Sequence, residues 1–183
     1  EIFANADSVI VEVDMDKDII KKVVALAKQY NKKLYGVVSN MSIAVERRDF
    51  LKHFDCFICN QLEAGMLFME DYADKSPEEL RDILSKRVIL GKIPAMIVTM
   101  GGNGAVYADV NGEKGICPPQ RVRVKDTTGA GDAFCAGVAS GLTYGKTLSE
   151  AVEIGSRLAA SVITSSENVC PRFLPEEFGI TLD

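Results

Sequence analysis

The sequence predicts an α/β domain with a mostly parallel sheet. Segments rich in β-branched and other apolar residues alternate along the chain with stretches in which apolar residues recur at helical spacing. The connections are short, and no internal repeat, low-complexity tract or interdomain linker interrupts this alternation. Such a succession is typical of strand–helix–strand units, whose strands pair in parallel.

Composition argues against several classes of protein. The chain has 183 residues, of which 47% are hydrophobic and 26% charged, as in a globular domain with a substantial core. Its net charge of −5 comes without a basic block, which argues against nucleic-acid or acidic-membrane partners. No apolar run approaches membrane-spanning length, and no leader with a cleavage site is expected. The chain starts at Glu1, close to its first expected strand, which suggests part of a longer protein.

Five cysteines lie in apolar contexts, which favours reduced, buried thiols in a cytoplasmic protein. Cys56 and Cys59 form C-x-x-C, but in a strand these positions point to opposite faces. Neither a metal site nor a redox pair is therefore expected there. His53, the single histidine, has no evident fellow ligands.

In the first half of the chain, strands are expected at residues 8–13 (SVIVEV), 33–39 (KLYGVVS) and 55–60 (DCFICN). Helices are expected at residues 16–30, 44–52 and 61–69. In the first of these helices the residues that recur at helical spacing are Ile19, Val23, Leu26, Ala27 and Tyr30.

In the second half, a helix follows Ser76, with Pro77 at its first position and Glu79 completing a capping box. A strand at 94–102 (PAMIVTMGG) ends in glycines, and residues 104–109 (GAVYAD) are its expected hairpin partner. Residues 121–126 (RVRVKD) are expected as a strand leading into a glycine-rich loop and a helix. The last helix begins at Thr147, where Glu150 completes a second capping box, and runs to about Ser165.

Three segments each follow an expected strand: Asn60, residues 99–104, and residues 126–132. In parallel sheets the active site lies outside the carboxyl ends of the strands. These segments are therefore expected to gather along one edge.

The loop GAGD (residues 129–132) combines an anion-attracting helix start with an acid, Asp132. A dinucleotide fingerprint is a weak interpretation, because Phe134 replaces the last glycine and only Glu150 or Glu153 could serve as the ribose-binding acid. A glycine turn shaped only for packing is another alternative, but neither explains the acid. Asp132 makes chemical sense as a base on a hydroxyl group, while neighbouring N–H groups hold developing negative charge.

Two other motifs are individually weaker. In NQLE, Asn60 could simply cap a helix, or Asn60 and Glu63 could hold a hydrated Mg²⁺ near phosphates. In TMGGNG (residues 99–104), the glycines could mark a turn between two strands or let a phosphate approach the backbone. No P-loop motif is present.

In this order, N-x-x-E, T-x-G-x-x-G and D-T-x-G-A-G-D resemble the ribokinase-like (PfkB) family of carbohydrate and nucleoside kinases. The resemblance covers essentially the whole chain, residues 1–183, as the C-terminal nucleotide-binding and catalytic portion of such a kinase domain. It implies a three-layer αβα sandwich from which the N-terminal strands and the β-lid are missing. Their absence would leave an exposed sheet edge or apolar face and a tendency to self-associate, for example as a homodimer.

The resemblance also implies roles for individual residues. Asp132 would be the catalytic base, and the N–H groups of Gly129, Ala130, Gly131 and Asp132 would form the anion hole. Asn60 and Glu63 would organise Mg²⁺ through water, and Asp126 with the carbonyl of Thr128 would hold a monovalent cation such as K⁺. The residues implied in ATP binding are Asn60, Thr99, Gly101, Gly102, Gly104, Gly131 and Ser156.

Within the family, VVSNMS (residues 37–42) and SSENVCP (165–171) are most similar to pseudouridine kinases, although Asn168 replaces a usual threonine and Gly36 a frequent acid. The leading expectation is MgATP-dependent phosphorylation of a primary hydroxyl of a sugar or nucleoside, with pseudouridine as the first guess. One alternative is a non-catalytic nucleotide-binding module that needs the missing N-terminal part. Another is a dinucleotide-dependent oxidoreductase.

Overall fold

The computed structural model describes residues 1–38, 45–165, 169 and 173–181. The chain forms two compact units, residues 1–116 and 117–183. Most of VVSNMS and SSENVCP, including Asn168 and Cys170, lies outside the described residues. The substrate expectation that depends on these segments therefore stays a prediction.

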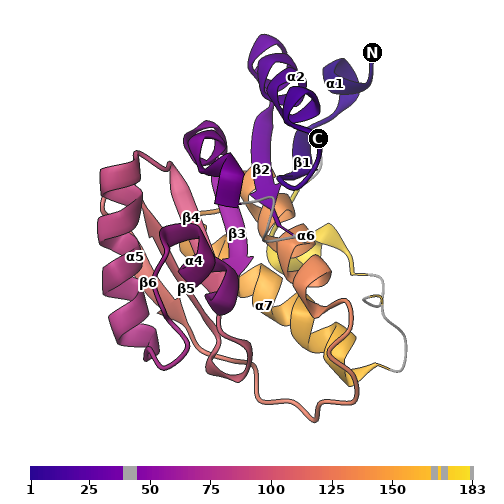
Figure 1. Cartoon of the computed structure of the whole chain (residues 1–183). Coiled ribbons are helices and arrows are strands. Elements are labelled where there is room, and N and C mark those ends of the chain that lie inside the picture. The colour runs from indigo at the N-terminus through magenta and orange to yellow at the C-terminus, as the bar shows by residue number, and fades with distance from the viewer. Residues whose placement is uncertain (39–44, 166–168, 170–172, 182–183) are drawn as a thin grey trace. The chain divides into compact units, whose positions relative to one another are not determined.

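The first unit is built on a six-stranded sheet whose strands lie in chain order (Figure 1). The strands are β1 (Ser8–Glu12), β2 (Lys33–Val37), β3 (Cys56–Asn60), β4 (Ala95–Thr99), β5 (Ala105–Asp109) and β6 (Lys114–Cys117). β1 to β4 pair in parallel, and β5 pairs antiparallel to β4 as its hairpin partner. The predicted α/β class is therefore confirmed, whereas β6 was not predicted.

The helices of the first unit are α1 (Ile2–Asn5), α2 (Lys17–Gln29), η1 (Val45–His53), α4 (Gln61–Phe68), α5 (Pro77–Gly91) and the short η2 (Gly101–Asn103). The expected capping box of α5 is present, because the N–H of Glu79 donates to Ser76 Oγ and that of Ser76 to the Glu79 carboxylate. η1, expected as a helix at 44–52, is a 3₁₀-helix.

The buried face of α2 differs from the expected one. Ile20 is fully buried, whereas Ile19 is 46% exposed and Tyr30 is 37% exposed. Ile20 and Ala27 are the buried residues of the helix. Because Ile19 and Ile20 are adjacent and equally apolar, spacing alone does not decide which of them faces the core.

The second unit contains α6 (Ala130–Thr143), α7 (Leu148–Thr164) and η3 (Pro175–Phe178). α6 and α7 lie side by side (Figure 1), and a Cβ added to Gly137 would come within 2.7 Å of the Gly155 Cα. The N–H of Glu150 donates to Thr147 Oγ1, which forms the expected capping box of α7. Both predicted helices are therefore confirmed.

The expected strand at residues 121–126 is wrong. Pro118 and Pro119 follow β6 directly, and proline supplies no N–H to a sheet. Val122 and Val124 are 40% and 55% exposed, so the alternating pattern has no apolar surface to cover it. The segment that precedes the loop before α6 thus belongs to no strand of the sheet. Among the described helices, none is both long and apolar enough to cross a membrane.

Candidate functional site

Asn60 and Thr99 are brought together by the pairing of two parallel strands. They are register partners at the carboxyl ends of β3 and β4. Thr99 Oγ1 also donates to the carbonyl of Cys59, with 3.5 Å between the oxygens. Two of the three segments singled out from the sequence therefore lie side by side at the expected edge of the sheet.

The NQLE motif forms the first turn of α4. The N–H of Glu63 donates to Asn60 Oδ1 at 2.9 Å, and the N–H of Asn60 donates to Glu63 Oε2 at 2.7 Å. The capping alternative is thus realised. Burial raises the pKa of Glu63, and the hydrogen bond from Asn60 opposes this shift.

Asn60 and Glu63 also suit a hydrated Mg²⁺. Hard oxygen atoms are the ligands that Mg²⁺ prefers, and it usually keeps several of its waters. Asn60 Oδ1 and Glu63 Oε2 each accept a capping hydrogen bond, and contact through those waters leaves this cap in place. No cluster of three or more His, Cys, Asp or Glu residues suited to a metal occurs in the described parts of the chain.

The glycine segment after β4 is open to an approaching ligand. Gly101 and Gly104 have positive φ angles of 55° and 86°, which side chains other than glycine rarely adopt. A Cβ on Gly101 or Gly102 would meet no atom within 4 Å. The carbonyl of Gly104 accepts from the N–H of Met100 at 2.8 Å, which closes the turn into β5. The segment is both the turn between two strands and an exposed stretch of backbone.

Asp14 is a residue of this edge that the sequence analysis missed. It follows Glu12, the last residue of β1, by two positions, and Glu12 aligns through Val37 with Ile58 of β3. Asp14 therefore lies in the turn that follows β1, and Asn60 ends β3, so both residues stand at the carboxyl ends of parallel strands. Asp14 Oδ1 is buried, and no hydrogen bond to it is found among the described residues. A buried carboxylate oxygen without a donor is costly, so Asp14 is a candidate for contact with a ligand.

In the second unit, the GAGD loop begins α6 with an exposed first turn. Gly129 is the N-cap, in the left-handed conformation with φ of 80°, and Asp132 lies in the first turn. The N–H of Ala130 donates to the carbonyl of Thr127 at 3.2 Å, which forms a tight turn. The N–H groups of Gly131 and Asp132 belong to the turn where no carbonyl of the helix can accept from them. A Cβ on Gly131 would meet no atom within 4 Å.

Two further predicted residue sets also lie in the second unit. Asp126 Oδ1 accepts from the N–H of Thr128 at 2.9 Å and from its hydroxyl at 2.8 Å. These hydrogen bonds hold the pKa of Asp126 below its usual value, so it stays a carboxylate. Ser156 lies on α7, and its hydroxyl is hydrogen-bonded to the thiol of Cys117, whose pKa is raised mainly by burial.

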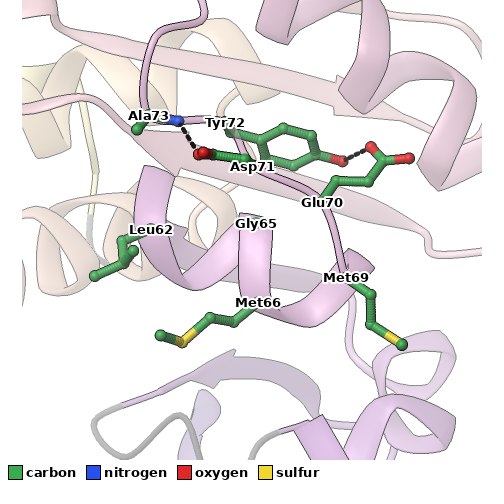
Figure 2. Close-up of a pocket in the computed structure, with 8 residues that line it drawn as sticks. All are labelled: Leu62, Gly65, Met66, Met69, Glu70, Asp71, Tyr72 and Ala73. Carbon is green, nitrogen blue, oxygen red and sulfur yellow. Dashed lines mark hydrogen bonds between the residues drawn. The ribbon is translucent and has the colours of Figure 1, made fainter.

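A separate cavity of about 430 Å³ lies beside α4 (Figure 2). Its walls come from α4 and from residues 69–73, and no residue predicted to bind ATP or to act in catalysis lines it. The buried thiols expected from the sequence are found at Cys56, Cys59 and Cys117, whereas Cys135 is half-buried.

The fold and this arrangement define an α/β protein in which a glycine turn begins α6 and an acid lies in the first turn of that helix. The model of the pfkB family of carbohydrate kinases matches residues 1–171. The chain belongs to this family. The recognition based on the three motifs is confirmed.

Individual proteins show the same likeness. The guanosine-inosine kinase of Exiguobacterium acetylicum is 34% identical over 165 residues, which cover 88% of this chain and 53% of that protein. The pseudouridine kinase of Escherichia coli is 35% identical over 69 residues, 38% of this chain and 22% of that protein. A probable sugar kinase from Rhizobium etli has a similar structure, with a TM-score of 0.78, 25% identity and coverage of 98% of this chain and 56% of that one. The chain thus spans about half the length of the relatives that it matches along most of its own length.

Proposed function

We propose that this chain is the nucleotide-binding and catalytic part of an ATP-dependent kinase that phosphorylates a primary hydroxyl of a sugar or nucleoside. The observation that carries the proposal is the start of α6, where the left-handed turn at Gly129 precedes Asp132 in an exposed first turn. A carboxylate in the first turn would repel an anion bound at the same helix start. A helix start that both holds phosphate and takes up a proton needs one.

Each part of this turn has a chemical task. Asp132 accepts the proton of the acceptor hydroxyl while the hydroxyl oxygen forms a bond to the γ-phosphorus of ATP. The bond from that phosphorus to the bridging oxygen breaks, and ADP leaves with the electron pair. The N–H groups of Gly131 and Asp132, together with the helix dipole, stabilise the charge on the transferred phosphoryl group.

The sheet edge of the first unit serves the nucleotide phosphates in this proposal. Asn60 and Glu63 orient the waters of Mg²⁺, which when bound neutralises phosphate charge. The exposed backbone at Gly101 and Gly102 accommodates the phosphates and ribose beside Thr99. Ser156 contributes to the adenine site, and Asp126 with Thr128 contributes the monovalent-cation site.

Asp14 is proposed as an acceptor for hydroxyl groups of the sugar or nucleoside. Its buried oxygen without a hydrogen bond from a described residue supports this assignment. Two or three hydroxyl donors on a ribose ring could satisfy such an oxygen, whereas an apolar ligand could not.

For the acceptor, a nucleoside is favoured over a simple hexose. The likeness to a guanosine-inosine kinase over 88% of this chain supports this choice. Pseudouridine, the substrate suggested by VVSNMS and SSENVCP, is supported by a likeness over 38% of the chain. A purine nucleoside is therefore a candidate to be compared directly with pseudouridine.

The test is phosphorylation by the complete protein that contains this chain, measured on a panel of pseudouridine, guanosine, inosine, adenosine, ribose and fructose with MgATP. The proposal expects a nucleoside to give the highest kcat/KM. A higher kcat/KM for a hexose would refute the nucleoside preference. Binding of MgADP with no turnover of any acceptor would instead support a non-catalytic nucleotide-binding module.

A further inference from the structure

We propose that Gln61 is a positioning residue that fixes the first turn of α4, and with it the pair Asn60 and Glu63. The proposal rests on the function proposed above, in which this pair orients the waters of Mg²⁺. Gln61 is the first residue of α4 and lies between the two members of the pair. The motif N-x-x-E assigned it no role.

The segment that follows α4 turns back along the helix. Met69 takes the left-handed conformation with φ of 58°, and the chain reverses there. The N–H of Glu70 donates to the carbonyl of Gly65 at 2.9 Å. A Cβ on Gly65 would come within 2.6 Å of the Glu70 carbonyl oxygen, so the returning backbone lies directly on the middle of the helix. Figure 2 shows residues 70–73 passing over Gly65.

Gln61 ties the far end of this returning segment to the start of the helix. Its Nε2 donates to the carbonyl of Tyr72, and it lies 3.3 Å from that of Ala73 and 3.4 Å from that of Lys75. An amide group has two N–H donors, so these three carbonyls share them. The helix and the segment are thus joined at Gly65 in the middle and at Gln61 at the beginning.

The segment after α4 is itself held in place, so the carbonyls that accept from Gln61 have fixed positions. Tyr72 is 3% exposed, and its hydroxyl donates to Glu70 Oε2 at 2.7 Å. Glu70 is also paired with Arg87 of α5. Rotation of the first turn of α4 would therefore require Gln61 to leave its carbonyls while the segment stayed in place.

Gln61 acts through its neighbours. Its amide donors go to protein carbonyls, so they are not directed at a nucleotide. The capping hydrogen bonds between Asn60 and Glu63 have lengths of 2.7 and 2.9 Å and depend on the conformation of the turn that contains Gln61. Outer-shell partners of this kind determine how well a metal-binding group is oriented.

The test uses the complete protein with Gln61→Glu and Gln61→Met. Glutamate keeps the size of the side chain but turns a carboxylate toward three carbonyls, and methionine removes the donor without adding charge. Leu62→Ala, on the same turn and 65% exposed, is the matched control. The Mg²⁺ concentration for half-maximal activity is measured together with the KM for the acceptor.

Both Gln61 variants are expected to need roughly 10-fold more Mg²⁺, as when other outer-shell partners are removed. The acceptor KM should not change, and Leu62→Ala should behave as wild type. Unchanged Mg²⁺ dependence in Gln61→Met would overturn the proposal, as would an equal loss in all kinetic parameters. The methionine variant keeps the test valid if the glutamate variant does not fold.

Amide hydrogen exchange separates this proposal from the proposed function. Wild-type protein without kinase activity would refute the function. The positioning role of Gln61 would still predict faster exchange at the Glu63 amide in Gln61→Met, with unchanged exchange at the amides of α5. Equal exchange at the Glu63 amide in wild type and Gln61→Met would refute the positioning role of Gln61.

Discussion

Asn60 and Thr99 face each other as register partners across β3 and β4, and Thr99 Oγ1 donates to the carbonyl of Cys59, the residue before Asn60. The start of α4 and the glycine segment after β4 are therefore fixed by the same pair of strands. Ile58 and Ile97, the partners two positions earlier, are buried and hold this pair of strands in the core. Substitutions at this edge should raise the KM for MgATP by more than their cost in unfolding free energy would explain.

Asn60→Ala removes the capping acceptor of α4. Loss of such a cap costs about 0.5–2 kcal/mol of unfolding free energy. Ser76→Ala, which removes the equivalent cap of α5, is the matched control and should cost a similar amount. Only Asn60→Ala is expected to raise the KM for MgATP. Denaturant unfolding measures the two losses of stability, and steady-state kinetics measures the two KM values. Equal KM values in the two variants would show that Asn60 acts only as a cap.

Met69→Gly should stabilise the protein. Met69 has φ of 58° and is 75% exposed, so glycine relieves backbone strain and gives up mainly the contact of the Met69 sulfur with Arg48. A net gain of about 0.5–1 kcal/mol is expected in denaturant unfolding, because relief of about 1–2 kcal/mol of left-handed strain exceeds the roughly 0.5–1 kcal/mol that the flexibility of glycine costs. Met66→Gly, in the interior of α4, should instead lose about 1 kcal/mol. A loss at Met69 would mean that its side chain contributes more than the strain costs.

Gly131→Ala should separate stability from function. Alanine is the better helix former by about 0.5–1 kcal/mol, and its Cβ would meet no atom within 4 Å. The same methyl group would occupy the space through which a phosphate reaches the first turn of α6. We expect a higher melting temperature and weaker ADP binding by calorimetry. Unchanged ADP affinity would contradict the anion-hole role of Gly131.

Tyr72 should make stability fall at alkaline pH. Burial and, next, the hydrogen bond to Glu70 raise its pKa from 10.0 to about 12. In the unfolded chain it deprotonates near 10.0, whereas the folded protein holds the proton to about 12. Its contribution is therefore complete below pH 10 and is lost as pH rises through this window. Unfolding free energies of wild type and Tyr72→Phe should converge there, and a constant difference between them would contradict this assignment.

Local signals in the sequence predicted the helix starts well. The capping boxes at Ser76 and Thr147 depend on residues three positions apart, and both are present. Hydrophobic runs predicted strands β1 to β5, because such runs are also local signals in the sequence. The segment 121–126 failed because a strand needs a partner, which an alternating pattern of valine and arginine does not reveal.

Parts of the candidate site depend on contacts that the sequence does not display. Asp14 looks like an ordinary turn residue, and only the fold shows that one of its oxygens is buried without a hydrogen bond from the described residues. Gln61 looks like a polar helix residue, because its partners lie 11 to 14 positions further along the chain. Asp132, in contrast, was singled out from GAGD, since an acid after a glycine turn conflicts with simple anion binding, and its role stays a prediction.

The central claim is that Asp132 takes up the proton of the acceptor hydroxyl, and kcat of Asp132→Asn in the complete protein tests it most directly. Glu150→Gln, which changes an acid in the first turn of α7, is the matched control for a loss of helix stability. We expect turnover by Asp132→Asn to fall at least ~10²–10⁴-fold, as for the loss of a general base, while ADP affinity holds or rises. Glu150→Gln should keep near-normal turnover. Near-normal turnover in folded Asp132→Asn would contradict the account and leave Asp132 with only its effect on the helix dipole, worth about 0.3–1 kcal/mol.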